Sequence, residues 1–300
     1  MTWGLLGRRL AALGPIAVGA AAAVLLGSWQ AGAIFTPPPP VPLTDASCSG
    51  GYVVFTFDGG PLESPAGGTP LILSTLEGLH ARGVFFDVGT AVTKNPAMIR
   101  QEVADGDLVE NHTWNHEDFT GQSTGGKPLT PAQVRTVLAE GAAAIVRAGA
   151  PAPKLYRPPF DDVTKADNKV AASLGERIVM SYGLPGTGIV DSQDWREKFT
   201  GPQIAYNVIH GSVNESGVYI PGLDSKTART YIIGYHDGLD AKVSGPAAQS
   251  LQPIVKYMNA NNMCGTTNVP DPADGGVLNG AGGTGGATGG SVDAKSPAGP

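Results

Sequence analysis

Two histidines four positions apart are the feature of this sequence with the clearest chemical meaning. His112 and His116 stand in the run Asn-His-Thr-Trp-Asn-His at 111–116. Two imidazoles at this spacing can bind one metal ion, and a carboxylate with water would complete a catalytic coordination shell. The chain has five histidines, and three of them follow predicted strands, which favours a metal site over a scatter of surface histidines.

Other ionisable side chains stand where predicted strands end. Asp58 follows one apolar run, Arg157 follows a second, Asp191 and Asp194 follow a third, and His236 follows a fourth. In parallel α/β sheets the chemistry is found at the carboxyl ends of the strands. These positions therefore predict one shared site.

The elements that would position these residues alternate between short apolar runs and segments of helical periodicity. This alternation predicts parallel pairing, in either an open doubly wound sheet or a closed (β/α) barrel. Thr130 and Pro131 predict the start of a long helix, as its N-cap and first helical residue. We expect strands at 52–57, 84–88, 108–110, 154–157, 177–182, 188–191 and 231–235, and helices at 71–79, 95–104, 131–148, 163–174, 202–210 and 247–260.

Five short motifs follow one another between Thr56 and Asp237. They are Thr-Phe-Asp-Gly-Gly-Pro at 56–61, His-Thr-Trp-Asn-His at 112–116, Arg-Pro-Pro-Phe at 157–160, Asp-Ser-Gln-Asp-Trp at 191–195 and Ile-Gly-Tyr-His-Asp at 233–237. In this order they resemble the motifs of the polysaccharide deacetylase family, carbohydrate esterase family 4. The resemblance implies a distorted (β/α) barrel with about seven strand–helix units. It also implies metal-dependent removal of acetyl groups from N-acetylglucosamine-containing polysaccharide, such as peptidoglycan or a chitin-like polymer, or from O-acetylated xylan.

The resemblance also assigns roles to individual residues. His112 and His116 would hold a divalent metal ion, with zinc expected and cobalt as the alternative. Asp58 would be the general base that takes a proton from water, and Arg157 would pair with it and keep it ionised. His236 would be the general acid that protonates the departing amine.

Further residues of the motifs are expected to support this chemistry. Asp194, or alternatively Asp191, would orient His236 and hold its charge. The substrate would be contacted by Trp195, Pro159, Phe160 and Tyr235, with Trp195 forming a wall of the acetyl pocket and the backbone near Phe160 binding the oxyanion.

One position departs from the family pattern. The second aspartate of the first motif, normally the carboxylate ligand of the metal, is Gly59 here. Asp58 could move to the metal, or Asp118 or Asp161 could replace the missing ligand. Alternatively, the protein is a weakly active or inactive glycan-binding relative. We favour an active hydrolase, because the other four motifs are intact.

The two ends of the chain differ from its middle. Residues 1–33 combine Arg8 and Arg9 with an apolar run and the small residues Ala-Gly-Ala at 31–33, which predicts a cleaved signal peptide, with a membrane anchor as the alternative. A proline-rich linker would follow at 34–47, the catalytic domain at 48–268 and a glycine-rich disordered tail at 269–300. A secreted or cell-envelope-associated protein is expected.

Charge and cysteine content restrict the partners and the compartment. The formal net charge is −6 and no cluster of Lys and Arg is present, which argues against nucleic acid and is compatible with a neutral polysaccharide. We expect a monomer. Cys48 and Cys264, the only cysteines, bracket the predicted domain and could form one disulfide in an oxidising compartment; two free thiols are the alternative.

Overall fold

The structure is a computed structural model that describes residues 42–64, 67–183, 186–214, 216–238 and 241–270. The predicted export segment, most of the predicted linker and all but the first two residues of the glycine-rich tail lie outside these residues. None of the described helices is long and apolar enough to cross a membrane.

A curled parallel sheet of eight strands forms the centre of the domain. Its order is β7-β6-β5-β4-β1-β11-β8, and β12 pairs with the beginning of β1. The sheet curls into a half-barrel covered by helices, which confirms the predicted distorted (β/α) barrel. The strands are β1 (Gly51–Asp58), β4 (Gly83–Asp87), β5 (Leu108–Asn111), β6 (Leu155–Tyr156), β7 (Arg177–Ile178), β8 (Ile189–Asp191), β11 (Thr230–His236) and β12 (Met263–Gly265).

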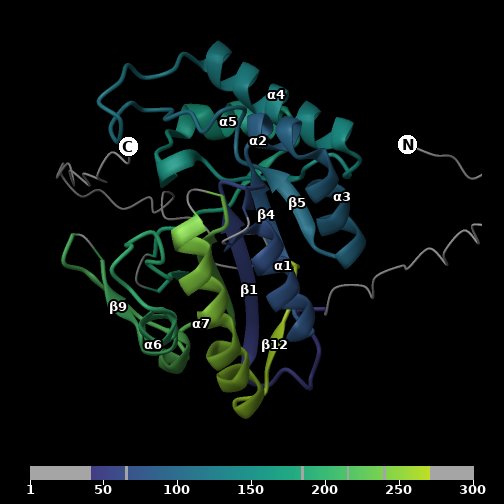
Figure 1. Cartoon of the computed structure of the whole chain (residues 1–300). Helices are drawn as coiled ribbons and strands as arrows, with labels where there is room; N and C mark the ends of the chain where they lie inside the picture. The colour runs from purple at the N-terminus through teal and green to yellow at the C-terminus, as the bar shows by residue number, and fades with distance from the viewer. Residues whose placement is uncertain (1–41, 65–66, 184–185, 215, 239–240, 271–300) are drawn as a thin grey trace, which may run out of the picture. The chain divides into compact units, whose positions relative to one another are not determined.

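Helices α1 and α7 lie along β1, and α6 packs beside α7 (Figure 1). Helix α4 packs against α2, α3, α5 and β5 on another side of the sheet. The helices are α1 (Thr69–Gly78), α2 (Gly89–Lys94), α3 (Pro96–Asp105), α4 (Pro131–Ala148), α5 (Lys165–Ser173), α6 (Gly201–His210) and α7 (Ala241–Ala260), with short 3-10 helices at η1 (Pro159–Asp161) and η2 (Leu223–Ser225). Two small antiparallel pairs, β2 (Glu63–Ser64) with β3 (Gly67–Gly68) and β9 (Ser212–Val213) with β10 (Tyr219–Ile220), complete the described elements.

Alternation along β1 divides the core into two layers. Phe55 and Phe57 pack with residues of α1, α6 and α7. Val54 belongs to a second cluster that includes Val84 and Ile232 on the neighbouring strands. Since side chains two residues apart in a strand share a face, Asp58 points to the same side as Val54, at the carboxyl end of the sheet.

The structure confirms two local predictions. Thr130 caps α4, its Oγ1 accepting from the backbone N–H of Gln133 at 3.3 Å, and the Gln133 side chain completes a capping box. A disulfide joins Cys48 and Cys264, whose Cα atoms are 5.4 Å apart. It links the segment before β1 to β12, so the two ends of the domain are covalently tied.

Other elements differ from the prediction. Helix α7 begins at Ala241 rather than 247 and contains Pro246 and Pro253, each of which removes one backbone N–H donor. Helix α7 packs against both α6 and α1. Helix α2, strand β12 and the β9–β10 pair were not predicted, because each is too short to produce a periodic pattern.

Candidate active site

Asp58, at the end of β1, forms a buried ion pair with Arg157, which follows β6. Arg157 Nη1 donates to Asp58 Oδ1 at 2.6 Å, and the two side chains are 0% and 3% exposed. Burial raises the pKa of Asp58, and the positive charge of Arg157 opposes that rise. Asp58 is therefore a stronger base than an ordinary, solvent-exposed aspartate.

The guanidinium of Arg157 is held on every side. It donates to Thr56 Oγ1 at 2.8 Å, to the carbonyl of Val179 at 3.0 Å and to that of Met180 at 3.3 Å. It also lies 4.3 Å from the ring centre of Phe86. Thr56 was not predicted as part of the site, although its position two residues before Asp58 places it on the same face of β1.

His236, at the end of β11, is held by Asp194. Its Nδ1 lies 2.9 Å from Asp194 Oδ1, and its backbone N–H donates to Asp194 Oδ2 at 2.7 Å. Burial by itself would lower the pKa of His236, but the charge and hydrogen bond of Asp194, with the charge of Asp58, raise it to about 9. His236 is therefore protonated at neutral pH, and its Nε2 remains as a proton donor.

Asp191, the other candidate for this orienting role, has a different environment. Its Oδ1 accepts from the backbone N–H of Gln193 at 2.8 Å, which shapes the loop that carries Asp194. Burial raises the pKa of Asp191 to about 6. Of the two aspartates, Asp194 is the one that contacts His236.

His112 and His116 lie together at the end of β5. Their ring centres are 4.9 Å apart, which brings two imidazoles close enough to face one ion. The backbone carbonyl of Arg157 lies 2.8 Å from His112 Nδ1, so a proton on Nδ1 leaves Nε2 free as a ligand. Burial and the neighbouring charge of His116 lower the pKa of His112, and burial lowers that of His116 to about 4.

These two neutral imidazoles fit a divalent ion such as zinc, but they supply only part of a catalytic ligand set. Among the described residues no group of three His, Cys, Asp or Glu side chains is placed to hold a metal. Gly59, with φ +88, occupies the position of the expected carboxylate. Water would have to fill the remaining positions around the ion.

Neither of the two substitute carboxylates is free for that purpose. Both oxygens of Asp118 accept backbone N–H groups of the loop at 120–124. Asp161 accepts from the backbone N–H groups of Ser181 and Tyr182. Each carboxylate organises its own loop, and Asp58 is held by Arg157.

The residues expected to contact substrate fall into two groups. Phe160 is 36% exposed and its ring meets His116 edge-on with centres 4.8 Å apart, while Trp195 is partly exposed and lies under Arg196. Pro159 is buried. Tyr235 is 0% exposed and stacks on Phe57, so the prediction that it contacts substrate does not agree with the structure. Tyr235 shares a face of β11 with Tyr231 and Ile233, and this face packs in the core cluster that includes residues of α1, α6 and α7.

A cluster of buried carboxyl groups behind this site was not predicted. Asp87, Glu102 and Asp237 are each 0% exposed. Asp87 and Glu102 approach closely enough to share a proton, and no other donor among the described residues reaches their four buried oxygens. Thr69 Oγ1 donates to Asp237 Oδ2 at 2.5 Å. The three acids come from β4, α3 and the end of β11, so no sequence pattern brings them together.

The sequence profile of the polysaccharide deacetylase family matches residues 46–179, which contain the first three of the five motifs. The peptidoglycan-N-acetylglucosamine deacetylase PgdA of Listeria monocytogenes is 28% identical over 176 residues, 59% of this chain. That alignment covers 33% of PgdA, so the chain spans about a third of that relative's length. With the fold and the arrangement of the motifs, these matches show that the chain is similar to the polysaccharide deacetylase family.

Solved structures share the fold. A peptidoglycan N-acetylglucosamine deacetylase superposes with a TM-score of 0.56 at 20% identity, covering 76% of this chain and 88% of the other. A family 4 carbohydrate esterase from Streptomyces lividans, in complex with acetate, gives a TM-score of 0.54 at 25% identity, covering 76% and 97%.

Two further structures concern the metal and the activity. An acetyl xylan esterase from Clostridium thermocellum, solved with a cobalt ion, gives a TM-score of 0.52 at 22% identity and covers 72% of this chain and 87% of the other. A pseudoenzyme of the family from Bacillus anthracis gives 0.52 at 15% identity, covering 77% and 66%, and a mutant of it with restored enzymatic activity is also known.

Proposed function

We propose that this domain is a hydrolase that removes acetyl groups from N-acetylglucosamine units of an extracellular polysaccharide, either peptidoglycan or a chitin-like polymer. The observation that carries the proposal is the pairing of a buried base with a charged acid at neighbouring strand ends. Asp58 and His236 are register partners of β1 and β11, and each has its own counter-charge, Arg157 and Asp194.

The chemistry of these residues suits amide hydrolysis. Asp58 would accept a proton from the attacking water as its oxygen bonds to the acetyl carbon. His236 would donate its Nε2 proton to the nitrogen as the carbon–nitrogen bond breaks, which releases acetate and a free amine. A divalent ion held by His112 and His116 would polarise the carbonyl and lower the pKa of bound water.

Arg157 and Asp194 act through the residues that they hold. The guanidinium favours the ionised form of Asp58 against the effect of burial, and the carboxylate favours the protonated form of His236. Without these two partners, burial would favour the neutral forms, so that Asp58 would be protonated and His236 would lose its proton.

Gly59 supports a second candidate, a glycan-binding protein with little or no catalysis. Without a carboxylate ligand, the histidine pair is expected to hold zinc more weakly than a three-ligand site. The pseudoenzyme neighbour shows that a protein with this fold can lack activity and regain it by mutation. Asp58, Arg157, Asp194 and His236 keep their mutual contacts here, which favours the hydrolase.

Acetate release by the full chain in excess zinc or cobalt tests the proposal, with N-acetylglucosamine hexamer, peptidoglycan and O-acetylated xylan as substrates. The relative rates on the three substrates distinguish amide from ester hydrolysis. We expect release from the hexamer and from peptidoglycan, abolished by chelator and by His112→Ala. No release from any substrate in excess metal would overturn the hydrolase.

Gly59→Asp separates the two candidates. If the protein is a hydrolase, we expect the wild type to release acetate and the variant to release it faster than the wild type at limiting zinc. Acetate release by the variant alone would support the glycan-binding protein. Gly125→Asp is the matched control, because Gly125 also has a positive φ of 72 and open space around it. It should change neither the rate nor the zinc dependence.

A further inference from the structure

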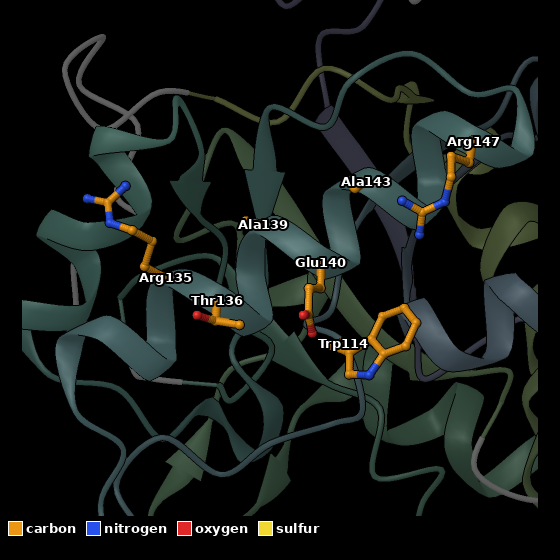
Figure 2. A pocket seen from close by; sticks show the side chains of 7 residues that line it. All are labelled: Trp114, Arg135, Thr136, Ala139, Glu140, Ala143 and Arg147. Atoms are coloured by element: carbon orange, nitrogen blue, oxygen red, sulfur yellow. The ribbon is translucent and has the colours of Figure 1, made fainter.

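A groove of about 610 Å³ runs along the outer side of α4. It is separate from the acid and base residues described above, but one wall is Trp114, which belongs to the loop between His112 and His116. Figure 2 shows the side chains that line it. They are Trp114, Arg135, Thr136, Ala139, Glu140, Ala143 and Arg147.

The shape of the groove follows from the spacing of residues on α4. Ala139 and Ala143 are four residues apart, so they lie on one face of the helix, and their methyl groups leave room between the longer side chains. Glu140 and Arg147 stand on the same side and are exposed. The groove therefore has an apolar floor and charged edges.

Trp114 is fixed in place by packing on its inner side. A Cβ added at Gly89 would come within 2.7 Å of the indole, so only glycine at the start of α2 leaves room for the ring. The backbone carbonyl of Trp114 accepts from the N–H of Thr90 at 2.8 Å. Figure 2 shows the indole with its ring face toward the viewer, beside Glu140 and below Arg147 in the view.

This combination points to a neutral, polyhydroxylated ligand. An aromatic face provides apolar contact area, which suits the C–H face of a pyranose. Among the described residues no partner hydrogen-bonds or ion-pairs with the side chain of Glu140 or of Arg147. The carboxylate can therefore accept from hydroxyl groups, and the guanidinium can donate to them. The lining carries charges of both signs, Glu140 beside Arg135 and Arg147, which suits hydroxyl groups because they both donate and accept. An apolar helix would bury these charges without partners.

We propose that the groove formed by Trp114, Glu140 and Arg147 is a binding subsite for a pyranose unit of the glycan, distinct from the unit that is deacetylated. The identity of the ligand as an acetylglucosamine polymer rests on the proposed function; the groove itself does not.

The subsite is built into the metal-binding loop. Trp114 is two residues from both His112 and His116, and two residues of extended chain span at most about 7 Å. A sugar that stacks on the indole is thus held beside the loop that presents both histidines. Long oligosaccharides are expected to gain affinity from this contact, whereas short ones that reach only the acid and base residues are not.

Calorimetric binding of N-acetylglucosamine hexamer and dimer to the full chain tests the subsite without requiring turnover. Glu140→Ala/Arg147→Ala should weaken hexamer binding roughly tenfold, the effect expected for losing hydrogen bonds to charged groups, and should leave dimer binding unchanged. The matched control Glu77→Ala/Lys169→Ala removes the same charges from exposed positions of α1 and α5 and should bind both ligands as the wild type does.

A third variant, Trp114→Leu, removes the aromatic face and keeps apolar volume against α2. It should weaken hexamer binding, with folding checked by circular dichroism. Equal hexamer affinity in the wild type and the Glu140→Ala/Arg147→Ala variant, or no hexamer binding by the wild type, would overturn the subsite even if acetate is released. Loss of hexamer affinity in that variant, in a protein that releases no acetate, would uphold the subsite and reject the hydrolase.

Discussion

Asp58 and His236 are register partners on β1 and β11, the two strands with the most extensive pairing in the sheet. Their side chains belong to separate pairs of opposite charge, Asp58 with Arg157 at 2.6 Å and His236 with Asp194 at 2.9 Å. The arrangement holds a carboxylate and an imidazolium next to each other in opposite protonation states. This relationship leads to the predictions below.

The pH profile of acetate release should show an upper limit set by His236. The pKa of His236 is raised to about 9, and the general acid is the protonated form, so the rate should fall as the pH rises above about 9. In Asp194→Asn the negative charge that raises this pKa is lost, and the upper limb should move down by more than one pH unit. Measurement of kcat against pH for both proteins checks this, and an unmoved limb in Asp194→Asn would contradict the assignment.

Removal of Arg157 should destabilise the fold, because it leaves Asp58 buried without its counter-charge. Breaking one side of a buried ion pair costs about 3–5 kcal/mol, and Arg157→Met should lower the free energy of unfolding in urea by that amount. Combining it with Asp58→Asn removes the orphaned charge and should recover part of the loss. A double variant no more stable than Arg157→Met would show that the broken ion pair does not cause the loss of stability.

The disulfide between Cys48 and Cys264 should contribute substantially to stability. It closes a loop of 216 residues, for which the chain-entropy model gives about 5 kcal/mol and experience with small domains about 2–5. The Cys48→Ser/Cys264→Ser variant should unfold at a lower urea concentration than the wild type. Reductant should lower the stability of the wild type and leave that of the variant unchanged. Equal stability of the oxidised wild type and the variant would refute this role.

The buried pair Asp87 and Glu102 should make the protein less stable as the pH rises. Burial raises both pKa values well above the ordinary range, and the negative charge of Asp237 adds to the rise at both groups. The folded state therefore binds protons that the unfolded chain releases near pH 4. Stability is highest below that pH and is lost as the pH rises toward the folded-state pKa values.

Asp87→Asn supplies an amide donor to Glu102 and removes one charge. It should gain about 1–3 kcal/mol at pH 8 and less at pH 5, as measured by urea unfolding at both values. Glu77→Gln, at an exposed position of α1, is the control and should be neutral. A gain for Asp87→Asn that does not depend on pH would argue against a shared proton.

The sequence predicted those parts of the molecule that depend on local pattern. We predicted the strands β1 and β11 and the Thr130 cap, because periodicity and capping chemistry act within short segments. We also predicted the disulfide, because two cysteines allow only one pairing, Cys48 with Cys264. The curled parallel sheet followed from the alternation of strands and helices and from the five motifs.

The rest depended on contacts between distant segments. Burial turned Tyr235 from an expected substrate contact into a core residue, since a motif does not specify which side of a strand faces helices. Asp87, Glu102 and Asp237 meet only through packing of β4, α3 and β11. The choice between Asp191 and Asp194 likewise required the geometry of the loop, which places only Asp194 on His236.

The central claim is that Asp58 and His236 form the base and acid of one hydrolytic site. It is tested most directly by the rate of acetate release from N-acetylglucosamine hexamer by the wild type, Asp58→Asn and His236→Asn in excess zinc, with zinc binding and folding measured for each. We expect wild-type turnover and a loss of about 10²–10⁴-fold in either variant, the range typical of general acid–base catalysis, with zinc binding retained. Rates in both variants within a few-fold of the wild type, or no turnover by the wild type, would contradict the claim.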